Sequence, residues 1–177
     1  MEFIEFPKIP RLSREMVITE KIDGTNASIT ITEDGQFLIG SRTRWITPFD
    51  DNHGFAAWAT ERKDELMQLG VGTHFGEWWG LGIQRKYGMD RKVFSLFNVS
   101  RWADSAVRPA CCSVVPELYR GNFDTAMINA ILDGMRETGS VAAPGFMNPE
   151  GVVIFHVAAN RCFKKTLEKD DVPKGKA

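Results

Sequence analysis

The chain has 177 residues, the length of one domain or of one domain with a small extension. Its 22 basic and 23 acidic residues nearly cancel, which excludes a broadly basic nucleic-acid-binding protein but allows a local basic patch. The three cysteines are odd in number, and none forms a CxxC pair, so we expect neither a disulfide framework nor a zinc site.

Hydrophobic periodicity predicts two helices among several strands. In chain order we expect strands at 16–22, 27–33 and 36–42, a helix at 52–69, strands at 73–78 and 92–99, a helix at 123–138, and strands at 152–157 and 161–167. Asp34-Gly35 predicts a hairpin turn, and Gly70 and Gly139 predict helix ends. This order favours an α+β fold of mainly antiparallel sheets with flanking helices. We expect one domain at 1–168 and a polar tail at 169–177.

The stretch TEKIDGTN places Lys21 at the end of a predicted strand, with Asp23 expected on the same strand face. A lysine amine attacks only when it is neutral, and its reference pKa is about 10.4, so a nucleophilic lysine needs burial or a neighbouring cation. Gly24 would let a nucleotide approach the backbone closely. Thr25 and Asn26 offer hydrogen bonds. The alternative is an ordinary hairpin, because Asp-Gly is common in turns.

Two arginines lie at and just after the end of the strand predicted at 36–42, in GSRTRW. This strand is expected to be the hairpin partner of the lysine strand. Arg42 and Arg44 are expected on one strand face, where they could hold a phosphate or a ribose. The alternative is a solvated basic face.

Two isolated glutamates also occur at strand positions. In FGEWWG, Glu77 stands between glycines and tryptophans, and a buried glutamate needs a partner such as a ribose hydroxyl. In PEGVVI, Glu150 opens an apolar strand, and carboxylate oxygens are what Mg²⁺ prefers. The alternatives are the rim of a packed aromatic turn for Glu77 and an incidental charge at a strand end for Glu150.

The last predicted strand carries adjacent lysines, in CFKKTLE. Because strand side chains alternate between faces, only one of Lys164 and Lys165 can point inward toward a phosphate. The alternative is an edge strand that lysines protect from aggregation.

The order and spacing of these segments resemble the covalent nucleotidyltransferases, namely RNA ligases, DNA ligases and mRNA capping enzymes. The family's motifs are similar to KIDGTN at 21–26, Arg42, GEWWG at 76–80, FSLFNV with Phe97, EGVV at 150–153, and Lys164 in the final strand. The family's last motif usually has two lysines spaced by one residue. Here that spacing pairs Lys164 with Thr166, so the motif's phosphate role falls to Lys164 and the role of Lys165 stays open.

This resemblance implies a lysyl-nucleotide mechanism. A lysine attacks ATP to form lysyl-AMP, AMP passes to a nucleic-acid 5′-phosphate, and a 3′-hydroxyl then seals the strand. The implied roles are nucleophile for Lys21, ribose binding for Glu77, adenine stacking for Phe97, Mg²⁺ or Mn²⁺ binding for Glu150, α-phosphate contact for Lys164, nucleotide or strand-end contact for Arg42, and nucleotide binding for Asp23, Gly24, Thr25 and Asn26.

The residues around the motifs are most similar to those of small ATP-dependent RNA ligases of phage and bacterial type. This similarity implies RNA repair and RNA as the favoured nucleic acid. The implied fold is a nucleotidyltransferase (ATP-grasp-like) catalytic core. Since only nine residues follow Glu168, we expect no OB-fold, and such a core could require an accessory protein. Arg85 and Lys86, together with Arg44, are candidate nucleic-acid contacts; the alternative for the 85–86 segment is a solvated basic loop.

Two other functions remain open. One is a small ATP-dependent DNA ligase or another nucleotidyltransferase, and the other is a catalytically silent nucleotide-binding module, against which the intact Lys21 and Glu150 argue. Cysteine usage, the absence of a signal-peptide pattern and the lack of a long apolar run predict a cytoplasmic protein, or one of the host cytoplasm if a phage encodes it, with no membrane partner. The sequence does not indicate an oligomeric state.

Overall fold

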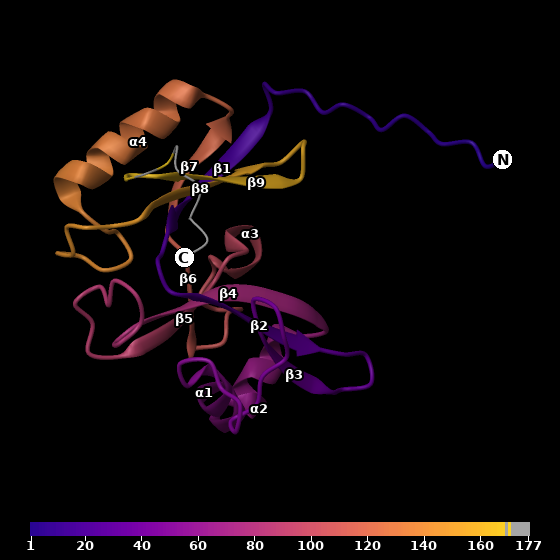
Figure 1. Ribbon diagram of the computed structural model, residues 1–177, viewed down its shortest axis with the longest axis vertical. Helices are drawn as coiled ribbons and strands as arrows, with labels where there is room; N and C mark the ends of the chain where they lie inside the picture. Colours follow the sequence, from indigo (N-terminus) through magenta and orange to yellow (C-terminus); the bar gives the residue numbers. More distant parts are fainter. Residues whose placement is uncertain (169, 171–177) are drawn as a thin grey trace.

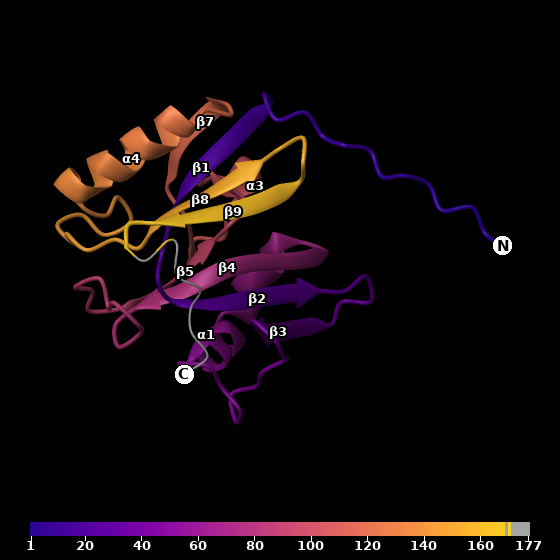
Figure 2. The ribbon, with the colours of Figure 1, turned by 45° about the horizontal axis from the view of Figure 1, so that its top comes forward.

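The structure is a computed structural model that describes residues 1–168 and 170. Its elements are β1 (Glu15–Lys21), β2 (Thr25–Ile31), β3 (Phe37–Ser41), α1 (Phe55–Glu61), α2 (Lys63–Leu66), η1 (Met67–Leu69), β4 (Gly72–Gly80), β5 (Lys92–Leu96), α3 (Val99–Trp102), β6 (Cys112–Val114), β7 (Glu117–Asn122), α4 (Thr125–Thr138), β8 (Gly151–His156) and β9 (Arg161–Thr166). The N-terminal residues extend away from both sheets (Figures 1 and 2), whereas the Leu12 carbonyl oxygen contacts His156 of β8 at 2.7 Å. None of the helices in the described ranges is long and apolar enough to cross a membrane.

The strands form two sheets that lie one above the other (Figure 1). Sheet A has the order β7-β1-β8-β9, and sheet B has the order β3-β2-β4-β5-β6. Neighbouring strands are antiparallel except for β5 and β6, which are parallel. The predicted α+β class with mainly antiparallel sheets is therefore confirmed. The chain passes from sheet A to sheet B between β1 and β2, so residues 22–24 form the crossing between the two sheets.

Helices cover the outer faces of both sheets. Helix α4 packs on sheet A, where Leu132 belongs to one buried cluster with Met16 and Ile18 of β1, whereas α1 and α2 pack on sheet B (Figure 2). Side chains alternate along a strand. Val17 accordingly points away from α4 and packs with Trp79 in the cluster between the sheets. Lys21 is four residues after Val17 on the same strand, so it also lies on the inner face of sheet A.

Several predicted boundaries are wrong for local reasons. The helix expected at 52–69 is broken at Arg62, whose φ of -111° and ψ of 19° are not helical, so α1, α2 and η1 replace it. Strand β5 ends at Leu96, because Asn98 caps α3 by accepting a hydrogen bond from the Arg101 N–H. Strands β6 and β7 were not predicted, since most of their residues are half-buried or exposed and show no clear alternation. The expected polar tail lies outside the described residues apart from Asp170.

Two predicted turns are confirmed. The Asp34-Gly35 pair joins β2 to β3 in a hairpin in which Ile31 faces Phe37. Gly139 ends α4 with a φ of 81°, a value that favours glycine. These two turns fix the register of the β2–β3 hairpin and the direction in which the chain leaves α4.

A buried carboxylate fixes the segment that leaves α4. Glu20 of β1 is 1% exposed, and it accepts hydrogen bonds from the Ser140 hydroxyl at 2.5 Å and from the Val141 and Ala142 N–H groups at 2.8 Å each. A buried carboxylate is tolerated when its oxygens are satisfied in this way. The contact therefore ties the strand that ends in Lys21 to the chain that leads toward β8.

Replacement of this carboxylate should destabilise the fold. Glu20→Ala would leave three buried donors without their acceptor, and we expect a loss of about 1–3 kcal/mol or more in the free energy of unfolding. Urea denaturation would measure it. The control is Glu15→Ala on the same strand, where the side chain is 50% exposed and pairs with Arg120 at the surface; that change should cost less than about 1 kcal/mol. Equal losses in the two variants would contradict the anchoring role.

Candidate active site

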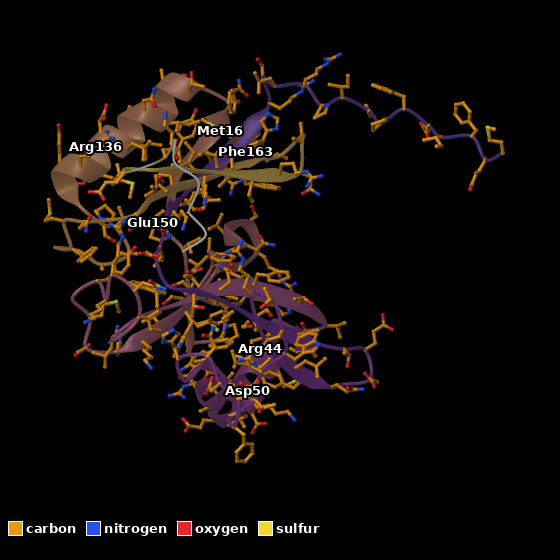
Figure 3. The ribbon with its side chains drawn as sticks, in the orientation of Figure 1. Met16, Arg44, Asp50, Arg136, Glu150 and Phe163 are labelled. Carbon is orange, nitrogen blue, oxygen red and sulfur yellow. The ribbon has the colours of Figure 1, made fainter. Side chains whose placement is uncertain are left out.

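The predicted nucleophile and the predicted metal ligand are in direct contact. The Nζ atom of Lys21 donates a hydrogen bond to Glu150 Oε2 at 2.6 Å, and the Glu150 side chain is only 6% exposed. Lys21 pairs with Gly151 across the β1–β8 ladder, which places Glu150 beside the end of β1. Figure 3 shows Glu150 at the level between the two sheets, below α4. Two residues that lie 129 positions apart in the sequence therefore meet through strand register.

Glycine is required next to Glu150. Gly151 has a φ of 148°, and a Cβ atom at this position would lie 2.3 Å from the Lys165 carbonyl oxygen of β9. No other residue could stay in this backbone position without moving β9. The EGVV segment thus presents its carboxylate next to a position where the β9 backbone leaves no room for a side chain.

The crossing between the sheets holds the second glutamate. The Gly24 N–H donates to Glu77 Oε1 and the Asn26 side-chain amide donates to Glu77 Oε2, both at 2.9 Å. A Cβ atom at Gly24 would lie 2.4 Å from the Trp78 carbonyl oxygen and 2.7 Å from Trp79 Cβ. The missing side chain therefore lets the crossing lie directly on β4.

Burial changes the titration of Glu77, which is 7% exposed. Desolvation raises the pKa of Glu77 to about 7, against the opposing effects of the Gly24 N–H, the Lys21 charge and the Asn26 amide. The negative charge of Glu150 raises the pKa further. Lys21, Glu77 and Glu150 thus form one electrostatically coupled group on the facing sides of the two sheets.

Asp23 was predicted to share a strand face with Lys21, but it does not. Strand β1 ends at Lys21, so Asp23 belongs to the crossing, where its N–H donates to the Tyr87 hydroxyl at 2.8 Å and its carboxylate accepts from Arg85 Nε at 3.1 Å. Arg85 Nη1 also donates to the carbonyl oxygen of Asn148 at 3.0 Å and to its side-chain oxygen at 2.8 Å.

Arg85 therefore joins three segments: the β4–β5 loop, the crossing and the chain just before Glu150. Burial raises the pKa of Tyr87, which keeps its hydroxyl neutral beside Asp23. Arg85 was a candidate nucleic-acid contact because it lies in a basic segment, with a solvated basic loop as the alternative. The internal partners of Arg85 could not be found from the sequence, since they come from two distant segments. Its neighbour Lys86 is exposed, with a left-handed φ of 61°.

The two arginines after β3 do not lie on a strand face. Strand β3 ends at Ser41 and pairs with β2 in sheet B, and it is not the hairpin partner of the lysine strand β1. The expectation failed because the chain changes sheets at residues 22–24. Arg42 and Arg44 are exposed on a turn, and Arg44 forms an ion pair with Asp50. Figure 3 shows Arg44 and Asp50 well apart from Glu150.

Two further nucleotide-binding candidates occupy different positions. Thr25 lies on the same face of β2 as the buried residues Ala27 and Ile29, which is the face that the helices cover. The Thr25 hydroxyl accepts a hydrogen bond from the Asn52 side-chain amide at 2.9 Å. Phe97 follows β5 and is 40% exposed. The geometry thus gives Thr25 a partner within the fold and leaves the ring of Phe97 accessible.

The two lysines of β9 point to opposite faces of sheet A. Lys165 pairs with Val152, which belongs to the α4 cluster, and its Nζ donates to Asn129 of α4 at 2.7 Å. Lys164 pairs with Val153, and this register places it on the inner face with Lys21. Both lysines also line part of a groove that runs along β9 beside residues 10–12. The role of Lys164 at a phosphate stays a prediction.

The residues present fit a nucleotide-bound divalent cation better than a protein-only metal site. Within residues 1–168 and 170, no cluster of three or more histidine, cysteine or acidic side chains could hold a metal ion. Mg²⁺ is usually bound by one or two carboxylates, with substrate phosphates and water completing its shell. Glu150, next to Lys21, is the carboxylate that meets this description.

Comparison with solved structures shows which fold this is. Variants of an RNA ligase from Naegleria gruberi superpose on the chain. A variant with ATP and Mn has a TM-score of 0.66 at 17% identity, covering 89% of this chain and 51% of that protein, and a variant with AMP and Mn has 0.63 at 18% identity, covering 92% and 53%. An apo variant has 0.62 at 18% identity, covering 90% and 52%. The chain thus spans about half the length of these proteins.

Sequence comparison gives the family. A search of curated protein sequences gave no match. The sequence model described as RNA ligase matches residues 14–167, which include every strand and helix of the structure. The chain belongs to the RNA ligase family.

Proposed function

We propose that this chain is the nucleotidyltransferase core of an ATP-dependent RNA ligase. The observation that carries the proposal is the 2.6 Å contact between Lys21 Nζ and Glu150 Oε2, on the sheet that faces Glu77 and the crossing. It is supported by membership of the RNA ligase family and by the fold shared with an RNA ligase that was solved with ATP and Mn. The small RNA ligases of phage and bacterial type remain the predicted nearest group.

In the first step, the neutral amine of Lys21 attacks the α-phosphorus of ATP. The bond from this phosphorus to the bridging oxygen breaks, pyrophosphate leaves, and the amine loses its proton to give lysyl-AMP. An ammonium has no free lone pair, so Lys21 must lose one proton before it attacks, but the neutral amine can still donate an N–H to Glu150. Glu150 would hold Mg²⁺ or Mn²⁺, which supplies charge neutralisation at the phosphates.

The other residues bind and orient the nucleotide. Glu77 would accept hydrogen bonds from the ribose hydroxyls, Phe97 would stack on adenine and Lys164 would contact the α-phosphate from the inner face of β9. Positioning of this kind accounts for much of catalysis in phosphoryl transfer.

Two strand ends complete the reaction. A 5′-phosphate oxygen of RNA attacks the phosphorus of lysyl-AMP and releases Lys21, so that AMP is joined to the RNA end. A 3′-hydroxyl then attacks the RNA 5′-phosphate, AMP leaves and the phosphodiester is formed. The partner is therefore an RNA with 5′-phosphate and 3′-hydroxyl ends, and an accessory protein stays a prediction.

The first prediction is covalent labelling at Lys21. Incubation with ATP and Mg²⁺ should add one AMP to the Lys21 peptide, detected by mass spectrometry, and excess EDTA should prevent it. Lys21→Ala should remain unlabelled, whereas Lys63→Ala on the exposed side of α2 should label normally. Labelling that persists in Lys21→Ala would refute the assignment, and a preference for GTP would favour capping chemistry.

Sealing of matched RNA and DNA nicks would separate an RNA ligase from a DNA ligase.

The second prediction concerns pH. Because the pKa of Glu77 is raised to about 7, the carboxylate is protonated below this pH and accepts ribose hydrogen bonds well only above it. Adenosine, which lacks a titratable phosphate, should bind up to about tenfold more tightly at about pH 8 than at about pH 6. Glu77→Gln should remove this dependence. An NMR titration of each protein would measure affinity, and a flat profile for the unmodified chain would contradict the ribose role.

The third prediction separates the two lysines of β9. Lys164→Ala should slow lysyl-AMP formation by about 10²–10³-fold, because a cation at the transferred phosphate stabilises the developing charge. Lys165→Ala should have a mild effect, since its amine contacts Asn129 on the far face. Single-turnover rates with ATP would measure both. A crippled Lys165→Ala beside a near-normal Lys164→Ala would show that the roles are reversed.

A further inference from the structure

Three aromatic side chains remain exposed on one side of sheet B. Trp45 is 59% exposed, Phe75 is 60% exposed and Phe97 is 40% exposed. In the part of the chain that the structure describes, none of the three rings packs against another aromatic ring. Six other aromatic side chains in or near sheet B do pack in this way, namely Phe55, Trp58, Trp78, Trp79, Tyr87 and Phe94. Burial in the core therefore does not account for these three.

Strand register places the three rings in one row, which we call the aromatic row (Trp45, Phe75 and Phe97). Phe75 of β4 pairs with Ser28 of β2, and Ser28 pairs with Gly40 of β3. Trp45 forms a bridge back to Gly40, and a Cβ atom at Gly40 would lie 3.4 Å from two atoms of the indole. At the other end, the Phe97 N–H donates to the Phe75 carbonyl oxygen at 3.0 Å.

The row lies on the face of sheet B that turns toward sheet A. Ser28 and Phe75 share the alternation of Asn26 and Glu77, which are two residues along the same two strands. With strands about 4.8 Å apart, the three spacings from β3 to β5 amount to about 15 Å. This length exceeds that of the one adenine that Phe97 is proposed to bind.

The loop that carries Trp45 is both ordered and basic. It is closed by the hydrogen bond from the Ser41 N–H to the Arg44 carbonyl oxygen at 2.8 Å, and further along by two bonds between the Thr47 and Asp50 backbones at 3.0 and 3.3 Å. Arg42 and Arg44 are exposed and lie within three residues of Trp45 in the sequence, and Arg44 is paired with Asp50. An aromatic surface next to arginines matches a polyanion that offers flat bases, and a preorganised surface loses less entropy on binding.

We propose that Trp45 and Phe75 stack against a nucleobase of the RNA strand whose end reaches lysyl-AMP. The inference rests on the proposed ligase function, which brings an RNA end to Lys21. The adenylate base would occupy the Phe97 end of the aromatic row, and an RNA base would occupy the Phe75 and Trp45 end, with a neighbouring phosphate at Arg42. Aromatic stacking tolerates any base, as a repair ligase requires.

The test measures RNA affinity and lysyl-AMP formation separately, on the full chain. The probes are fluorescent single-stranded RNAs, one with a 5′-phosphate and one with a 3′-hydroxyl end, each also made with an abasic residue near that end. Fluorescence anisotropy gives the dissociation constant. Trp45→Ala and Phe75→Ala should weaken binding of at least one intact probe by about fivefold or more, and should differ little from the unmodified chain on the abasic probe.

A matched control comes from the same loop. Phe49 is 102% exposed but lies outside the aromatic row, so Phe49→Ala should bind RNA as the unmodified chain does. Lysyl-AMP formation should stay within about twofold in all three variants. Phe75→Leu, which keeps apolar bulk without the ring, replaces Phe75→Ala if thermal melting shows that the alanine variant is unfolded.

The outcomes separate the two proposals. Unchanged affinity in the Trp45 and Phe75 variants for both probes, or an equal loss in Phe49→Ala, would overturn the stacking proposal. A loss confined to lysyl-AMP formation would also overturn it, since the rings would then serve ATP. If the unmodified chain forms no lysyl-AMP, the proposed ligase function fails, while the RNA affinities still decide whether the aromatic row binds bases.

Discussion

The close approach of the chain to β4 at Gly24 is the constraint on which the arrangement of this protein depends. Only three residues separate the end of β1 from the start of β2, and in that distance the backbone leaves one sheet and enters the other. Any side chain at Gly24 would overlap the Trp78 carbonyl oxygen. The same approach brings the Gly24 N–H to Glu77, so the crossing supplies both the connection of the two sheets and a hydrogen-bond donor for a buried carboxylate.

The acids on either side of Lys21 hold the surroundings of the lysine in place. Glu20 binds the chain that leaves α4, and Asp23 binds Arg85, which also holds Asn148 just before Glu150. A charged group that is removed from water needs such partners, since its desolvation is otherwise unfavourable. Satisfying these two acids fixes the path of residues 140–150, which is the segment that delivers Glu150 to Lys21. Local sequence around the lysine thus determines where a segment more than a hundred residues away must lie.

The sequence predicted the elements of the fold better than their arrangement. Apolar patterns identified the strands at 16–22 and 27–33, but the strand at 36–42 was expected to be the hairpin partner of the lysine strand, and only the three-dimensional structure shows that it pairs with β2 in the other sheet. Arg42 and Arg44 were expected on one strand face, but β3 ends at Ser41, before either of them. The proximity of Lys21 and Glu150 follows from no local pattern and was anticipated through family resemblance alone. The sequence around Arg85 does not reveal its partners Asp23 and Asn148, and its contact with nucleic acid stays a prediction.

The register between β8 and β9 decides which lysine of β9 lies on the same face as Lys21. Strand β9 is an edge strand held by β8, and consecutive lysines at 164 and 165 put a positive charge on each of its faces. A shift of one residue along β8 would exchange the two amines. Lys165 would then be the inward cation, opposite either Val153, where Lys164 lies now, or Gly151. The doubled lysine therefore keeps one cation on the inner face of this edge strand in either one-residue shift, so an insertion of one residue in the turn at 157–160 would leave the charge of that face unchanged.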